Sequence, residues 1–179
     1  MSSVEGLPGE ITRYVRDTCL CLHLQRAARA VARHFDEAMR PLELTSGQFS
    51  LLMSLNRRQP PTIGDVSRVL AMDRTTVTAN LKPLQRRGLV EVTVGDGDRR
   101  RRCLGLTPAG RALLAAALPV WRREHAVVEG ELAGADRLRA DLRVLSGLGS
   151  ELAPVASSAA GSRDSGVICR DLPPPGATA

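Results

Sequence analysis

The segment "MDRTTVTANLKPLQRRGLVEVTVGDGDRRRRCLGLTPAGR", residues 72–111, changes its hydrophobic period halfway along. The apolar residues of its first half recur at steps of four and three: Val77, Leu81 and Leu84. This spacing predicts one buried stripe on a helix that begins after Asp73 and ends at Gly88. The second half alternates polar and apolar residues in "LVEVTV" and "RCLGLT", on either side of the turn-forming "GDGDRRR". The segment therefore predicts a helix followed by a β-hairpin.

Positive charge is concentrated in and around this segment. Residues 62–111 hold ten basic and five acidic side chains, so they carry a net +5 of the chain's +6. Each phosphate that a basic side chain neutralises releases counterions, and a localised basic surface is therefore typical of a nucleic-acid-binding protein. The alternative is an excess of charge that only keeps the protein soluble.

A short helix precedes this segment at "TIGDVSRVLAM", where Thr62 and Asp65 have the spacing of a reciprocal N-terminal cap. Two helices joined by a tight link and followed by a basic hairpin predict a winged helix-turn-helix, whose second helix enters the major groove. A helical hairpin with surface threonines is the alternative. The candidate DNA contacts lie on the exposed face of the second helix and at the hairpin tip: Arg74, Thr75, Thr76, Thr78, Lys82, Asp98, Arg99, Arg100, Arg101 and Arg102.

Long helices are predicted on both sides of this unit. Apolar residues at steps of three and four predict one helix over 11–40, about 45 Å long, which Pro41 ends. Residues 108–152 predict two more helices, the last with a leucine stripe. The predicted fold class is mainly α with a small β-hairpin wing: one domain over 11–152, with the winged unit at about 45–107 between dimerisation helices. Residues 153–179, rich in Ala, Ser, Gly and Pro, predict a disordered tail.

Three motifs together resemble the MarR family of transcriptional regulators. "SGQFSLLMSL", "MDRTTVTANLKPLQRRGLVE" and "DRRRRCLGLTPAGR" are similar to that family's second helix, recognition helix and wing, and the resemblance runs from about residue 15 to 150. It implies a homodimeric repressor that binds a pseudo-palindromic operator and responds to a small aromatic or lipophilic effector. Asp98 and Arg100 match the family's Asp-x-Arg, whose arginine enters the minor groove. Ala79 stands where the family often has an arginine, so one DNA contact is expected to be missing.

The same resemblance implies an effector pocket between the dimerisation helices and the winged unit. Its candidate lining residues are His23, Phe35, Phe49 and Trp121, all of which also suit a core position. The alternative is a redox sensor, because Cys21 matches the reactive cysteine of the family's organic-hydroperoxide-sensing branch. The tyrosines that contact this cysteine in that branch are replaced here by Phe35 and Ser46.

Other functional classes find little support in the sequence. No nucleophile–base–acid spacing or glycine-rich phosphate loop indicates an enzyme, and no cofactor is expected. Cys19 and His23 are four residues apart, but they supply two ligands where a metal site needs three or four. No apolar run approaches the roughly 20 residues of a membrane span, and "MSSVEGLPGE" has no signal-peptide pattern, so a cytoplasmic protein is expected.

Overall fold

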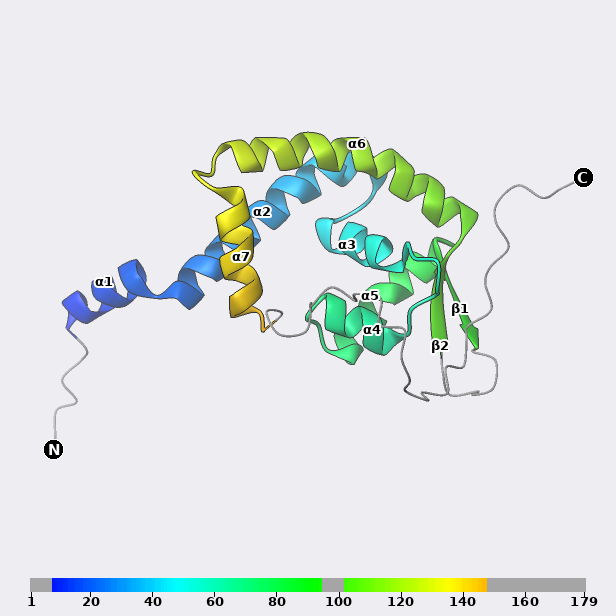
Figure 1. Cartoon of the computed structure of the whole chain (residues 1–179), viewed down its shortest axis with the longest axis horizontal. Helices are drawn as coiled ribbons and strands as arrows, with labels where there is room; N and C mark the ends of the chain where they lie inside the picture. Colours follow the sequence, from blue (N-terminus) through cyan, green and yellow to red (C-terminus); the bar gives the residue numbers. More distant parts are fainter. Residues whose placement is uncertain (1–7, 95–101, 148–179) are drawn as a thin grey trace, which may run out of the picture.

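The computed structural model describes residues 8–94 and 102–147. Their elements are, in order, α1 (Gly9–Thr18), α2 (Leu20–Met39), the 3-10 turn η1 (Arg40–Leu42), α3 (Ser46–Leu55), α4 (Ile63–Val69), α5 (Arg74–Arg86), β1 (Val90–Val94), β2 (Arg102–Leu106), α6 (Pro108–Gly130) and α7 (Ala135–Leu145). Figure 1 shows α6 and the end of α2 together along one side of the molecule, with α3, α4, α5 and the two strands beneath them. The predicted fold class, mainly α with a small hairpin, is confirmed.

Side-chain caps begin the two short helices of the winged unit. Thr62 Oγ1 accepts from the amide of Asp65, and Asp65 Oδ2 accepts from the amide of Thr62, so α4 starts with the predicted reciprocal cap. Asp73 Oδ1 accepts from the amide of Thr76 at 2.8 Å and caps α5. Because each cap satisfies amides that the helix leaves free, these residues fix where α4 and α5 begin.

The hairpin follows α5 directly. Gly88 has a φ of +66°, the left-handed conformation that glycine adopts most easily, and it ends the helix as predicted. β1 and β2 then pair antiparallel in a register from Val90 opposite Leu106 to Val94 opposite Arg102. The predicted buried stripe of α5 is confirmed, because these three side chains are at most 3% exposed: Val77, Leu81 and Leu84.

α6 packs closely against the start of β1. Its cap is Thr107, whose Oγ1 accepts from the amide of Gly110, with Pro108 at the first helical position. Gly110 is buried, and a Cβ built on it would overlap the carbonyl oxygen of Leu89. From there α6 runs unbroken through Pro119. The winged unit is therefore joined to α6 through a contact that has no room for a side chain.

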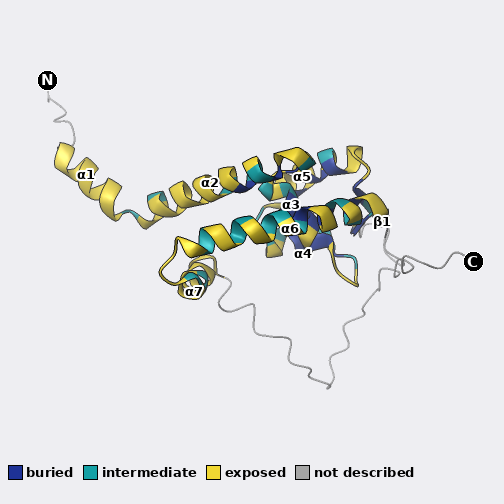
Figure 2. Cartoon of the chain, turned by 90° about the horizontal axis from the view of Figure 1, so that it is seen from above, coloured by how far each residue is buried: buried dark blue, intermediate teal, exposed yellow. Residues whose placement is uncertain are grey.

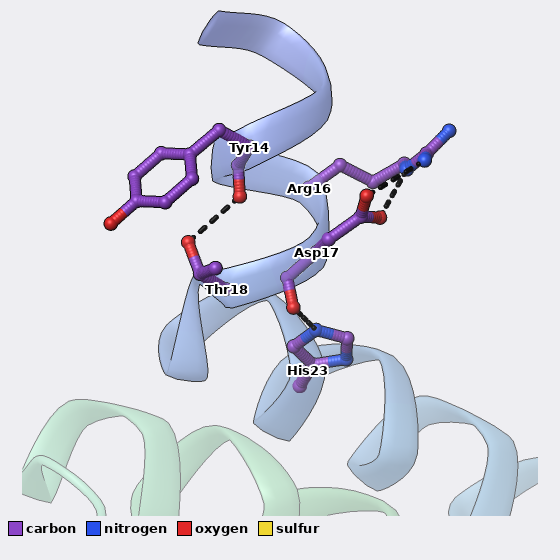
Figure 3. A network of polar contacts seen from close by, with 5 residues as sticks. All are labelled: Tyr14, Arg16, Asp17, Thr18 and His23. Atoms are coloured by element: carbon purple, nitrogen blue, oxygen red, sulfur yellow. Dashed lines mark hydrogen bonds and ion pairs between the residues drawn. The ribbon is translucent and has the colours of Figure 1, made fainter. Parts of the chain in front are cut away.

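The prediction of one helix over 11–40 is wrong in one respect, because the structure has two helices in this segment, α1 and α2. Cys19 is extended, with φ −71° and ψ 104°, and separates α1 from α2. Side chains meet the carbonyls at the end of α1, as Figure 3 shows: Thr18 Oγ1 donates to the carbonyl of Tyr14 at 2.7 Å, and His23 Nε2 lies 3.2 Å from that of Asp17. The Asp17 carbonyl is one of the last four of α1, which lack helical partners, so its contact with His23 supports the break.

The C-terminal helix is shorter than predicted. α7 ends at Leu145, and Gly147 then takes a left-handed φ of +71°, so the helix does not continue to residue 152 as one element. The predicted tail, 153–179, and the hairpin tip with Asp98, Arg99, Arg100 and Arg101 lie outside the described residues.

Both terminal helices leave their apolar side chains uncovered. Neither α1 nor α7 contains a buried residue, and Figure 2 shows exposed surface over almost all of α1. The large exposed hydrophobic side chains of these two helices are Ile11, Tyr14, Val15, Leu138, Leu142, Val144 and Leu145. Within the part of the chain that the structure describes, no helix is long and apolar enough to cross a membrane.

Candidate nucleic-acid interface and effector cavity

The first candidate surface is the outer face of α5. All five predicted contact residues on this helix are exposed: Arg74, Thr75, Thr76, Thr78 and Lys82. Arg74 and Lys82 take part in no ion pair within residues 8–94 and 102–147, so their charges are available to phosphates. The structure thus places these residues together on one uncovered, basic helix.

The threonines of this face are not equivalent. Thr76 Oγ1 donates to Asp73 Oδ2 at 2.5 Å, and Thr78 Oγ1 donates to the carbonyl of Arg74 at 2.7 Å. The hydrogen bonds from Thr76 hold the pKa of Asp73 below its usual range, which keeps that carboxylate ionised as a cap. In the described part of the chain, the Thr75 hydroxyl donates to no protein group, so it is the threonine best able to donate to a base or phosphate.

Arg74 links the two helices of the motif. Its Nη2 lies 3.3 Å from the point where a Cβ on Gly64 would stand, so the side chain extends along the first turn of α4. The absence of a side chain at Gly64 leaves room for the guanidinium at the junction of α4 and α5.

The wing is defined as far as the ends of its strands. Arg102 is exposed and lies opposite Val94, at the end of the hairpin where residues 95–101 connect the two strands. The other four predicted wing contacts fall in the connection outside the described residues: Asp98, Arg99, Arg100 and Arg101.

A second candidate site is a cavity between α2, α3 and α6. Its volume is about 400 Å³, and three of the four predicted lining residues contribute to it: Phe35, Phe49 and Trp121. The rings of Phe49 and Trp121 stack with centroids 6.2 Å apart. Met39, Leu70 and Met72 add further apolar surface. The cavity can hold an aromatic molecule of moderate size.

The fourth predicted lining residue, His23, lies elsewhere. It sits near the α1–α2 break, where its ring meets the carbonyl of Asp17 (Figure 3), and it faces the arginine-rich side of α2. The helical period placed His23 correctly on α2, but the cavity begins one turn later, at Ala28.

A polar contact beside the cavity, between α2 and α6, was not predicted from the sequence. His34 Nε2 on α2 lies 2.9 Å from Glu124 Oε2 on α6, and Arg123 Nε lies 2.7 Å from Glu124 Oε1. The hydrogen bond from Arg123, with the nearby His34, holds the pKa of Glu124 below its usual range. No motif signals this contact, because its partners come from helices far apart in the sequence.

The two N-terminal cysteines are free thiols close to the α1–α2 break: Cys19 forms the break, and Cys21 lies in the first turn of α2. Cys21 is exposed and accepts a 3.3 Å hydrogen bond from Gln25 Nε2, whereas Cys19 is partly covered. No group of three or more potential metal ligands occurs among the described residues.

Fold and site together define a winged helix-turn-helix protein of the DNA-binding class. The MarR family model matches residues 42–101, which span α3 through the first strand of the wing and its connection. The HTH-type transcriptional repressor NicR of Pseudomonas putida is 32% identical over 138 residues, which cover 75% of this chain and 82% of NicR. The chain belongs to the MarR family of transcriptional regulators.

Two solved structures show how closely the fold is shared. The M. tuberculosis regulator MosR, in complex with DNA, superposes with a TM-score of 0.67 at 36% identity, covering 73% of this chain and 95% of MosR. BpsR of Bordetella bronchiseptica, whose DNA binding is regulated by 6-hydroxynicotinic acid, gives a TM-score of 0.63 at 28% identity, covering 74% and 94% of the two chains.

Proposed function

We propose that this regulator is a repressor that binds a pseudo-palindromic operator as a dimer, reading it with α5. The observation that carries the proposal is the outer face of α5, which combines the available hydroxyl of Thr75 with the cations Arg74 and Lys82, neither of which forms an ion pair with another described residue. A helix in the major groove reads base edges with such groups. The DNA complex of the similar MosR supports this assignment.

The dimer is proposed from the terminal helices. The uncovered apolar side chains of α1 and α7 have no partner within one described copy, and a second copy of the chain would cover them. Twofold symmetry then sets two α5 helices about 34 Å apart, one turn of the duplex. Sedimentation of the full chain is expected to give twice the monomer mass of 19.2 kDa.

The wing completes the proposed interface. By resemblance to the family, Arg100 enters the minor groove and Asp98 orients it, while Arg99, Arg101 and Arg102 contact phosphates. The exposed Arg102 at the start of β2 and the net positive charge of this segment support that role.

Selection of bound sequences from random DNA tests this function. The expected result is an enriched pair of inverted half-sites whose centres are about 10 base pairs apart, since each α5 helix reads one half-site. Enrichment of a lone half-site would contradict the dimeric arrangement, and no enrichment would contradict sequence-specific reading.

The cavity between α2, α3 and α6 is proposed to bind the effector. It lies against α3 and the end of α4, so a bound molecule would contact the winged unit and the dimerisation helices at the same time. A ligand shifts the equilibrium between two conformations of a protein only if it binds one conformation more tightly than the other. A ligand in this cavity would do so if the winged unit moved relative to the dimerisation helices, because it contacts both. The regulation of BpsR by a small molecule supports a ligand-responsive repressor.

A second candidate function is peroxide sensing through Cys21. It is favoured by the position of two free thiols, Cys19 and Cys21, at the break between α1 and α2. The Cys21 thiolate would attack the outer oxygen of an organic hydroperoxide, releasing an alcohol and leaving a sulfenic acid. The Cys19 thiol would then displace water to form a disulfide across the break, changing the angle between the two helices.

Cys21→Ser tests this candidate. If Cys21 is the sensor, cumene hydroperoxide releases the operator from the wild-type protein and leaves the Cys21→Ser complex intact. Binding without peroxide stays unchanged, because Cys21 is exposed and remote from α5. A gel-shift titration with each protein measures operator binding in the absence and in the presence of the peroxide. Equal release from the two proteins, or none from the wild type, would exclude Cys21 as a sensor.

A further inference from the structure

The lining of the effector cavity carries no charge. Of the described side chains that form it, most are aliphatic, aromatic or thioether groups, and the polar ones are the hydroxyls of Ser46 and Ser50. An ion moved from water into such surroundings without a partner loses its hydration and gains little in return. The composition of the cavity therefore disfavours a charged ligand of either sign.

The first turn of α3 gives an additional reason against an anion. A helix N-terminus normally attracts a carboxylate through its free amides. Here the amide of Ser46 already donates to Asp36 Oδ1 at 2.6 Å, and that of Gln48 donates to Thr45 Oγ1 at 3.2 Å. Among the first-turn amides, that of Gly47, which lines the cavity, has no partner in the described part of the chain, but an anion that approached it would also lie near the carboxylate of Asp36.

Carboxylates on α6 lie beside the cavity and contact basic side chains of α2 and α6. His34 and Arg123 both contact Glu124, and His125 Nδ1 lies 3.4 Å from Glu129 Oε2. Among the described residues around the cavity, Arg123 is paired with Glu124, so its guanidinium is less available to an acid. One copy of the chain thus lines the cavity with apolar groups and two hydroxyls, and with no charged side chain.

We propose that the effector is an uncharged aromatic molecule with a hydroxyl or similar polar group, and that Asp36 helps to exclude aromatic acids. The ring would lie against Phe49 and Trp121, and the polar group would face Ser46 or Ser50. This inference rests on the proposed effector role of the cavity, and it specifies the charge of the ligand that the cavity accepts.

Calorimetry on the full chain with three matched probes tests the inference. The probes share a naphthalene ring and differ only at C2: hydroxymethyl, carboxylate or aminomethyl, the last two charged at neutral pH. The alcohol is expected to bind at least about tenfold more tightly than the carboxylate, because the cavity lining offers an anion no charged partner. The ammonium should have an intermediate affinity, because it also lacks a partner in the lining but is attracted by the nearby carboxylate of Asp36. A carboxylate that binds as tightly as the alcohol would overturn the proposal and would indicate a cation supplied by a second copy.

Three variants locate the binding and its selectivity. Ala28→Phe, which fills the edge of the cavity, is expected to abolish binding of the alcohol, whereas Ala27→Phe, on an adjacent exposed position outside it, leaves binding unchanged. Asp36→Asn keeps an acceptor for the Ser46 amide but removes the charge. The ratio between the dissociation constants of the carboxylate and the alcohol should therefore fall severalfold. An unchanged ratio of these dissociation constants would overturn the role of Asp36.

Operator binding by the same samples separates the two proposals. If the protein binds none of the probes but still binds the operator, the inference about the ligand is wrong and the DNA-binding function stands. If the operator is not bound either, the proposed function itself has failed.

Discussion

Gly110→Ala is expected to destabilise the protein more than any other replacement of a glycine by alanine in the described chain. The new Cβ would overlap the carbonyl oxygen of Leu89, and that carbonyl also accepts from the amide of Thr107 at 3.1 Å. Because backbone atoms on both sides form the contact, rotation of a side chain cannot relieve it. Overpacking of this kind costs about 3 kcal/mol in the free energy of unfolding.

Thermal unfolding of the full chain, followed by circular dichroism, measures this effect. A loss of about 3 kcal/mol in a domain of this size corresponds to a fall in Tm of roughly 10 °C. Gly130→Ala is the matched control, since it lies on the same helix with no atom within 4 Å of the new Cβ. The control should be neutral or slightly stabilising, because alanine favours a helix. Equal Tm values for the two variants would show that α6 does not approach β1 as described.

Arg74→Glu is expected to remove operator binding while leaving the fold intact. Arg74 is the first residue of α5, where an acidic side chain interacts favourably with the helix N-terminus, so stability is retained. On the DNA side, the substitution replaces a cation by an anion at the phosphate backbone or a base edge. Affinity for the operator should fall about 100-fold or more, since a single specific arginine contact is worth about 1–3 kcal/mol and the reversal adds repulsion.

Arg122→Glu provides the control for net charge. It makes the same change at an exposed position on α6, away from α5, and its affinity should stay within about threefold of the wild type at the same salt concentration. Fluorescence anisotropy with labelled operator compares the two variants, and thermal unfolding confirms that both are folded. A similar loss of operator affinity in both variants would mean that the overall charge of the protein, and not the face of α5, governs binding.

The winged unit was predictable because its signals are local. Thr62 caps α4 as predicted, α5 begins directly after Asp73, and Gly88 ends α5. Each of these signals depends on backbone groups within three or four residues, so the sequence contains the whole interaction. The positions of the α5 side chains follow from the same local information.

The breaks and contacts of the flanking helices were less predictable. The apolar period continues through Cys19 without glycine or proline, and the break is supported by a contact of His23 that periodicity does not encode. The end of α7 had a signal in Gly147, but the leucine pattern beyond it outweighed that signal in the prediction.

The cavity between α2, α3 and α6 was predicted by resemblance and not by spacing. Phe35, Phe49 and Trp121 converge from three helices, and no local pattern reports such a convergence. The error over His23 has the same cause, because the extent of a cavity along a helix depends on which other helices cover it. The His34–Glu124 pair is also a tertiary contact without a local signal.

The ratio of affinities for specific and random DNA tests the central claim most directly. The full chain is titrated, at about 0.15 M salt, with a selected pseudo-palindromic operator and with a random duplex of the same length and base composition. Reading by α5 predicts a dissociation constant at least about 10³-fold lower for the operator. Equal affinities for the two duplexes would contradict the account, because they would show a protein held by phosphate charge alone.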